Sequence, residues 1–493
     1  GDKGDNIPGA PGIGPKTASQ LINEFNNIDG LLKNLDKIKQ EKRRNILIQA
    51  EKDIKLSLQL VTLKKDVKIP SDINTIRTYN ELKKEKNNIF EFLKNQGFRS
   101  TSERLKSNSF ISINNDEVII KKEIEPKYQL IDSKKNFEKV IQEIEEKGIC
   151  AIDTETSSLN IEKADLVGIS LCCSEDIAYY VPINHTTPDG LKRIENQLEE
   201  KYIITYIKKI CQNEAILKIG QNIKYDIRIL NKYGIKFNSI ADTMLISYSI
   251  DNGIYKHNLD DLSFNHLNHT TIKYKEVVGT GKNEITFDRV AINNAVNYAA
   301  EDSLLTFKLY QNLYPRLIKE RANFIYQNID LPLVNVLSKI EANGIEVNKK
   351  FLTNLSLEFE KESKKLEKKI YNLSKEKFNI GSPKQLGEIL FINLKIPGGK
   401  KTKSGTFSTD SSTLSNLSAE GFEIAKFVLE WRELTKLKST YTDALFRLTD
   451  DNNRVHTSFG LANTLTGRLS STDPNLQNIP IRTENGKKIR TAF

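Results

Sequence analysis

The chain has 493 residues, enough for about two to four domains that each have a hydrophobic core. Its 74 Lys and Arg residues outnumber its 64 Asp and Glu residues, so the net charge is +10, which favours a polyanionic partner but is too diffuse to establish one. No apolar run approaches the about 18 residues that a membrane span requires, and nothing resembles a signal peptide, so we expect a multidomain protein without membrane contacts.

The cysteines indicate the compartment. They are Cys150, Cys172, Cys173 and Cys211. They show no paired metal-ligand spacing, and three of them lie in apolar runs, so we expect buried thiols in a reducing cytoplasm. The chain begins at Gly1 and has Met244 as its only methionine, which favours a first residue that is not the native start.

The first 16 residues are rich in glycine and proline and lead into a predicted helix, Thr17–Phe25. Glycines allow close approach to the backbone, and the free N–H groups at a helix start can bind a phosphate. Lysine-rich helical sequence, including the amphipathic stretch Glu81–Asn95, continues to about Arg104. The stretch Asn108–Pro126 is polar without a sustained period, so we expect a linker or an edge strand there.

From about residue 127 the pattern changes to alternating helices and strands. A helix is predicted over Lys135–Lys147, and strands are predicted over Gly148–Ile152, Leu166–Cys173 and Ala178–Ile183. We therefore expect a sheet flanked by helices, and sheets of this kind carry their functional groups at strand ends.

Two acids, Asp153 and Glu155, directly follow the apolar run Ile149–Ile152. Side chains two residues apart on a strand share one face, and a charge beside a buried strand is costly without a partner. We therefore expect a cation at this point. From this stretch alone, a turn with solvated acids is the alternative.

Two later stretches each place another acid at the edge of a buried element. The apolar strand Ala215–Ile219 passes through Gly220 into a helix that carries Asp226. Tyr298 and Asp302 are four residues apart on a periodic helix, so they share one face. Hard cations such as Mg²⁺ or Mn²⁺ prefer carboxylates, and two such ions about 4 Å apart can activate a water and stabilise the leaving oxygen of a phosphodiester.

The stretches IDTET, QNIKYD and YAAED, in this order and at these separations, resemble the three motifs of the DEDD 3′–5′ exonucleases, in the Tyr-containing subgroup that proofreads for family A DNA polymerases. The resemblance implies an RNase H-like α/β exonuclease domain with two divalent metal ions, Mg²⁺ or Mn²⁺. It also implies that Tyr298 orients the attacking water. The implied catalytic metal ligands are Asp153, Glu155, Asp226 and Asp302.

The same resemblance assigns other residues to the single-stranded 3′ end of DNA. Leu159 would wedge between the last bases, Gln221 and Asn222 would bind the sugar–phosphate backbone, and Tyr274 would stack on a base. Ordinary packing is the alternative for Leu159 and Tyr274. We interpret Asp242 as a helix N-cap rather than a metal ligand.

From about Ile318 the pattern becomes helical. Apolar residues at helical spacing predict one long helix with a buried stripe and a cationic face. The stripe comprises Leu352, Leu355, Phe359, Leu366, Ile370 and Leu373. The stretch Lys361–Lys403 contains twelve Lys and four Glu, a local charge of +8.

Two segments follow in this basic region. GSPKQLGEILF predicts a short capped helix, and KKTKSGTFST predicts a flexible basic loop. Such lysines often form only a solvated face, but both segments resemble the mainly helical thumb of family A DNA polymerases. The resemblance implies that they bind the phosphates of a primer–template duplex. The lysines concerned are Lys384, Lys400, Lys401 and Lys403.

The stretch Thr466–Arg482, TGRLSSTDPNLQNIPIR, supplies many donors suited to phosphates and to minor-groove acceptors. Its composition alone indicates a surface loop. It resembles a signature of family A polymerases, which implies that Arg468, Asn475 and Gln477 contact the primer–template near the primer terminus. The family's palm aspartates and fingers would follow Phe493 and are absent from this sequence.

The first stretch, GDKGDNIPGAPGIGPK, resembles the helix–hairpin–helix region of the 5′-nuclease domain in the same polymerase family. Asp2 and Asp5 match two metal ligands of that domain. The positions that match its duplex-binding hairpin are Gly9, Gly12, Gly14 and Lys16. The family's other metal carboxylates would lie upstream of Gly1, so we do not expect 5′-nuclease activity.

Together these interpretations predict a multidomain α/β and α protein of DNA replication and repair. The end of a 5′-nuclease domain would occupy residues 1–104, a linker 105–126, the 3′–5′ exonuclease domain 127–317, and the thumb with the start of the palm 318–493. We expect a monomer that binds DNA. An inert DNA-binding module is the first alternative, and the retained carboxylates argue against it. An RNA-trimming exonuclease is the second, and it would leave the stretch Thr466–Arg482 without a purpose.

Overall fold

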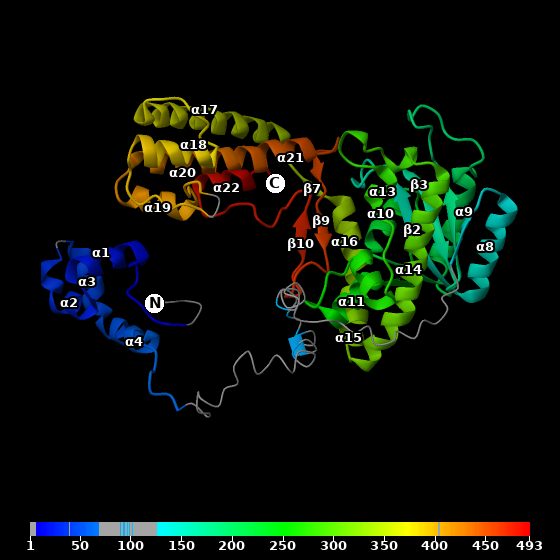
Figure 1. Ribbon diagram of the computed structural model, residues 1–493, viewed down its shortest axis with the longest axis horizontal. Coiled ribbons are helices and arrows are strands. Elements are labelled where there is room, and N and C mark those ends of the chain that lie inside the picture. The colour runs from blue at the N-terminus through cyan, green and yellow to red at the C-terminus, as the bar shows by residue number, and fades with distance from the viewer. Residues whose placement is uncertain are drawn as a thin grey trace. The chain divides into compact units, whose positions relative to one another are not determined.

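The computed structural model describes residues 6–38, 40–68, 126–402 and 405–493, together with residues 89, 92, 93, 96, 98 and 101 (Figure 1). The chain divides into two compact units. The first comprises Gly1–Lys86 and Lys365–Arg432, and the second comprises Asn87–Lys364 and Glu433–Phe493. The predicted helical stretch Glu81–Asn95 and the predicted linker 105–126 lie almost wholly outside the described residues.

The second unit is built around a six-stranded sheet with the strand order β1-β4-β3-β2-β5-β6. The strands are β1 (Lys127–Leu130), β2 (Ile149–Thr156), β3 (Leu166–Cys172), β4 (Ile177–Pro182), β5 (Leu217–Gly220) and β6 (Ile240–Asp242). β2, β3 and β4 pair antiparallel, whereas β1 with β4, β2 with β5 and β5 with β6 pair parallel. The mixed sheet flanked by helices is the α/β architecture that the sequence predicts.

β2 is longer than predicted, and this changes where its acids lie. The strand was expected to end at Ile152, but it continues to Thr156. Asp153 pairs with Ser170, and Glu155 pairs with Gly168 of β3, so both acids are held inside the ladder. The predicted end of the strand was wrong because the prediction follows the hydrophobic run. The ladder is made by backbone hydrogen bonds, and a charged side chain does not interrupt them.

Helices cover both faces of the sheet. α8 (Lys134–Lys147) and α9 (Glu200–Gln212) pack against the face that carries Cys150 and Ile152. α14 (Ile292–Lys319) packs through Ala300 and Leu304 against the other face, which carries Ala151 (Figure 1). Because strand residues alternate between faces, Asp153 and Glu155 lie on the same face as Ala151, the one that α14 covers.

Further helices complete this unit. They are α10 (Lys224–Asn231), α11 (Thr243–Asp251), α12 (Leu259–Leu262), α13 (Tyr274–Val278), α15 (Asn323–Ile325), α16 (Leu331–Asn343), α21 (Asp443–Leu448) and α22 (Glu484–Arg490). β7 (Ile345–Glu346) pairs antiparallel with β8 (Arg454–Val455), and β9 (Ser458–Gly460) pairs antiparallel with β10 (Ser470–Thr472). None of the described helices is long and apolar enough to cross a membrane.

The first unit is helical in its described residues. Its N-terminal part contains α1 (Pro15–Phe25), α2 (Ile28–Lys33), α3 (Glu41–Gln49) and α4 (Glu51–Val61), around a small core that includes Leu21, Leu31 and Leu47. Its other part contains α18 (Pro383–Glu388) and α19 (Ser411–Ala419), with most of α20 (Glu423–Lys436) and the C-terminal end of α17 (Lys349–Ser374). Ser382 caps α18, as predicted for this stretch.

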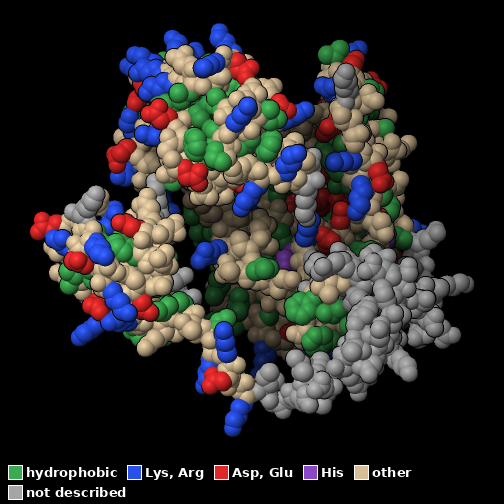
Figure 2. All heavy atoms as spheres, turned by 60° about the vertical axis from the view of Figure 1, so that its left-hand side comes forward, with side chains coloured by type: hydrophobic (Ala, Val, Ile, Leu, Met, Phe, Trp, Pro, Cys, Tyr) green, Lys and Arg blue, Asp and Glu red, His purple; other side chains and the backbone are tan. Residues whose placement is uncertain are grey.

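The long helix α17 follows the predicted pattern with one exception. Five of the six stripe residues are buried, but Leu373 is exposed because it lies at the end of the helix. The described lysines of Lys361–Lys403 are all exposed. Figure 2 shows Lys and Arg side chains gathered over the body formed by α17 to α20.

A buried histidine makes the stability of the sheet domain depend on pH. The Nδ1–H of His185 donates to the carbonyl of Val290 (3.0 Å), so its Nε2 accepts from the hydroxyl of Tyr180 (2.7 Å). Burial lowers the pKa of His185 to about 4, against about 6.5 in the unfolded chain. Between these values the unfolded chain binds the extra proton, so the contribution is full above about pH 6.5 and is lost as the pH falls towards 4.

We therefore predict that acid destabilises the wild type more than His185→Gln. The difference corresponds to at most about 3 kcal/mol between pH 7.5 and pH 4. Urea unfolding at several pH values, followed by circular dichroism, measures it. The two proteins share every other titrating group. If their free energies of unfolding changed with pH in parallel, this would contradict the conclusion that His185 is buried in its neutral form.

Candidate metal centre

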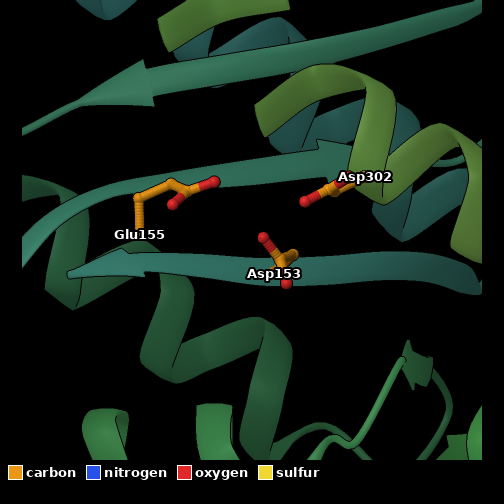
Figure 3. Close-up of side chains that lie close together, drawn as sticks. All are labelled: Asp153, Glu155 and Asp302. Atoms are coloured by element: carbon orange, nitrogen blue, oxygen red, sulfur yellow. The ribbon is translucent and has the colours of Figure 1, made fainter. Parts of the chain in front are cut away.

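Three carboxylates meet between the sheet and α14. Asp153 and Glu155 extend from β2 and Asp302 extends from α14, and one oxygen of each lies within 4.8 Å of the others. Figure 3 shows the three side chains pointing toward one another. Side chains of β2 alternate between the two faces of the sheet, which places Asp153 and Glu155 on the face that α14 covers. The packing of Ala300 on Ala151 then brings Asp302 to them, although 147 positions separate Asp302 from Glu155.

The environment of these carboxylates disfavours three negative charges. Burial raises the pKa of Asp153 to about 6. Burial, followed by repulsion from Asp153 and Asp302, raises the pKa of Glu155 well above its ordinary value. Burial, followed by repulsion from Asp153 and Glu301, also raises the pKa of Asp302 well above its ordinary value. Oε1 of Glu155 is buried and has no hydrogen-bond partner among the described residues. An all-oxygen site with an unpartnered buried oxygen fits a hard divalent cation.

Asp226 lies beside this cluster but does not join it within that distance in the described part of the chain. Its Oδ1 accepts from the backbone N–H (2.9 Å) and the hydroxyl (2.6 Å) of Thr154. Burial and then Asp153 raise its pKa well above the ordinary value, while the bonds to Thr154 oppose the shift. The structure therefore brings three of the four predicted carboxylates together and holds the fourth against β2.

Tyr298 lies one turn before Asp302 on α14 and shares a face with it, as the spacing predicts. Burial, followed by repulsion from Asp302, raises the pKa of the phenol far above its ordinary range. The ring of Tyr298 contacts Tyr274 (centroids 6.0 Å apart) and Phe287 (5.8 Å). Tyr274 thus lies beside the cluster, with 39% of its surface exposed.

The other residues predicted to contact a single strand lie near the same end of the sheet. Leu159 follows β2 and is 84% exposed, so it does not pack in a core. Asn222 is exposed and has a positive φ of 61° in the turn between β5 and α10. The Gln221 amide is already engaged, because it donates to the carbonyl of His257 (2.8 Å) and accepts from Thr243.

Several supporting residues are not visible in the motifs. Asp242 caps α11, as predicted, by accepting from Met244 N–H (2.9 Å). It also accepts from the N–H groups of Asn222 (3.1 Å) and Ile223 (3.0 Å), which holds the turn into α10. No sequence signal indicates this second role, because the partners are about twenty positions away.

A glycine shapes the wall of the centre. A Cβ on Gly168 would lie 2.1 Å from the hydroxyl oxygen of Tyr180, so the Tyr180 ring can cover β3 only because this residue has no side chain. Gly168 is paired with Glu155 in the ladder. The ring therefore lies on the same face of the sheet as Glu155, whose Oε1 has no hydrogen-bond partner among the described residues.

The residues predicted to contact duplex DNA lie on the surface wherever they are described. Arg468, Asn475 and Gln477 are exposed, and part of the predicted surface loop around them forms strand β10. Lys384, Lys400 and Lys401 are also exposed. Lys403 lies outside the described residues.

The predicted 5′-nuclease positions are described only in part. Gly9, Gly12 and Gly14 precede α1, and Gly12 has a φ of +76° that a side chain would disfavour. Asp2, Asp5 and the side chain of Lys16 lie outside the described residues.

Three family models match successive parts of the chain. Residues 128–318 match a 3′–5′ exonuclease family, residues 349–493 match DNA polymerase family A, and residues 1–85 match the C-terminal SAM fold of 5′–3′ exonucleases. These matches follow the order of the three resemblances found in the sequence.

Relatives and a solved structure show the same likeness. The chain is 37% identical to DNA polymerase I of Rhizobium leguminosarum over 100% of this chain and 56% of that protein. It is 36% identical to DNA polymerase I of Pseudomonas aeruginosa, over 100% and 54%. The polymerase domain of M. smegmatis Pol1 in complex with DNA primer–template and dNTP matches 74% of this chain and 58% of its own, with a TM-score of 0.60 and 25% identity. The chain thus spans about half the length of these relatives.

The crowded carboxylates predict that a divalent cation stabilises the chain. Mn²⁺ at about 100 times its dissociation constant should add about 2.7 kcal/mol to the free energy of unfolding. Asp153→Asn should abolish this gain and should raise the melting temperature in chelator, because it removes one of the repelling charges. Thermal melts with Mn²⁺ and with chelator measure both effects. Glu175→Gln, an exposed acid after β3, is the control and should behave as wild type.

Proposed function

Because the chain belongs to the DNA polymerase I family, with a 3′–5′ exonuclease domain and part of a polymerase domain, we propose that it hydrolyses the terminal phosphodiester of a single-stranded DNA 3′ end. The observation that carries the proposal is the convergence of Asp153, Glu155 and Asp302 around a buried, unpartnered carboxylate oxygen. The proposed domain boundaries are 1–104, 105–126, 127–317 and 318–493.

The carboxylates are proposed to hold two divalent ions, Mg²⁺ or Mn²⁺. Asp153, Glu155 and Asp302 would be the principal ligands, and Asp226, fixed by Thr154, would complete the set. Such ions activate a water as nucleophile and stabilise the charge that develops on the leaving oxygen. Asp153 and Glu155 lie on β2, Asp302 lies on α14 and Asp226 lies on α10, so three elements of the fold position the four carboxylates.

Tyr298 is proposed to orient the attacking water. Its raised pKa keeps the phenol protonated at neutral pH, so it acts as a hydrogen-bonding group rather than as a base. Asp302 lies one turn further along the same face of α14, and the rings of Tyr274 and Phe287 support the phenol.

The groups around the centre suit a frayed DNA end. Tyr274 offers a partly exposed ring on which a base can stack whatever its sequence, and Leu159 offers an exposed apolar side chain that can separate the last bases. Asn222 would contact the sugar–phosphate backbone. Gln221 would support that loop through its bonds to His257 and Thr243.

Duplex DNA is the proposed partner of the basic and C-terminal segments. The exposed lysines, with Lys403, would bind phosphates. Arg468, Asn475 and Gln477 would contact the primer–template, the ligand present in the matched M. smegmatis complex. We propose a monomer that acts in the cytoplasm. An inert DNA-binding module remains the second candidate, and degradation assays separate the two.

We predict that Asp153→Ala and Asp226→Ala each lower the rate of 3′-end degradation by about 10³-fold or more. The physical reason is the loss of several kcal/mol of charge stabilisation when the ions are lost or misplaced. The measurement is the shortening of end-labelled single-stranded DNA in Mg²⁺. Wild-type rates in both variants would contradict the metal assignment, and an inactive wild type would favour the inert module.

Tyr298→Phe should have a milder effect, about 10- to 100-fold in rate, because it removes one hydroxyl and leaves the carboxylates in place. Mn²⁺ binding should be unchanged in this variant. A loss of Mn²⁺ affinity as large as the loss of rate would assign Tyr298 to metal binding instead of water positioning.

We also predict that duplex binding weakens steeply with salt and depends on the lysines Lys384, Lys400, Lys401 and Lys403. Changing all four to Gln should reduce the slope of log K against log [salt] by about one for each phosphate that the variant no longer neutralises. Fluorescence anisotropy with a labelled primer–template at several salt concentrations measures this. The control changes four exposed lysines of α8 and α9, namely Lys135, Lys139, Lys201 and Lys208. Equal slopes in both variants would contradict the proposal that these four lysines belong to a DNA-binding thumb.

A further inference from the structure

The helix that carries Asp226 has a second, oppositely charged face. Lys224 and Arg228 of α10 are four residues apart and share one side of the helix, whereas Asp226 lies two residues from each and points to β2. All three side chains are buried. α10 has only eight residues, so the contacts that hold Lys224 and Arg228 also contribute to where Asp226 lies.

One carboxylate holds both cations. Glu341 of α16 is 1% exposed, and its Oε1 accepts from Lys224 Nζ while its Oε2 accepts from Arg228 Nη1 (3.1 Å). Glu162, which is partly exposed, is a further acceptor for Arg228. Burial lowers the pKa of Lys224, and Glu341 opposes that shift. Removing Glu341 would leave two buried cations with too little negative charge, a state that proteins avoid by rearranging.

The same carboxylate is bonded to the C-terminal segment. Glu341 Oε1 also accepts from the backbone N–H of Phe459 (2.7 Å), and the Phe459 carbonyl accepts from Lys224 Nζ (2.5 Å). Phe459 lies in β9, opposite Ser471 of β10. β10 belongs to the stretch Thr466–Arg482 that carries the residues proposed to contact the primer–template. Glu341 therefore joins α10, α16 and this hairpin at one point.

We propose that Glu341 is a positioning residue for the exonuclease centre. It fixes α10 against the β9–β10 hairpin and thereby holds Asp226 beside Asp153. This inference rests on the proposed function, because it assigns to Asp226 a part in metal binding. Thr154 bonds Asp226 on one side of α10, Asp242 holds the turn before the helix, and Glu341 bonds Lys224 and Arg228 on the other side, so loss of Glu341 removes the contacts that fix this second side.

The experiment compares Glu341→Gln with wild type in the full chain. Mn²⁺ is titrated without DNA and followed by electron paramagnetic resonance of the free ion, and single-stranded DNA degradation is measured beside it. We expect an about 10-fold or greater loss of Mn²⁺ affinity, as for residues that support metal ligands, and a lower kcat with KM unchanged. Glu358→Gln, which removes an exposed partner of Lys488, is the matched control and should change neither quantity.

The outcomes separate the two proposals. If folded Glu341→Gln binds Mn²⁺ as tightly as wild type, the positioning role is wrong even when the wild type is an active exonuclease. If the wild type binds no Mn²⁺, both proposals fail. If Glu341→Gln does not fold, Arg228→Met tests the positioning role instead, because this variant keeps the Lys224–Glu341 pair. It should shift Mn²⁺ affinity in the same direction by a smaller factor, and an unchanged affinity would overturn the inference.

Discussion

The structure depends on three carboxylates held close together in a place where they repel one another. β2 supplies two of them on one face, and α14 supplies the third by packing small side chains against that face. In the absence of a cation this arrangement raises the pKa of each group, most strongly through burial. A fold that maintains such an arrangement gives up stability at a site, and functional sites are where proteins do so.

Small residues make the arrangement possible. Ala151, Ser170, Gly168 and Ala178 lie on the sheet face below α14, and Ala300 faces them from the helix. Larger residues at these positions would move α14 away from β2 and separate Asp302 from Asp153. Gly168 has the additional task of admitting the Tyr180 ring. The geometry of the acids is therefore set largely by neighbours that carry no charge.

The sequence predicted a substantial part of this site. Period-two alternation placed Asp153 and Glu155 on one face, and helical spacing placed Tyr298 with Asp302. The end of β2 was misplaced because the hydrophobic run stops at Ile152 while the ladder with β3 continues. The bonds of Asp226 to Thr154, of Asp242 to the turn before α10, and of Glu341 to Lys224 could not be predicted. Each joins residues from 19 to 117 positions apart, and no local pattern records them.

The sequence by itself determined which side chains are available for the proposed chemistry. The motifs identify the acids, their order and the family, because residue types and short spacings are local properties of the chain. Only the tertiary structure decided that three acids meet while Asp226 is held by Thr154, and that Glu341 is bonded to both α10 and β9. The physical reason is that distances between side chains on separate elements depend on the packing of whole helices and strands, and many distant residues contribute to that packing at once.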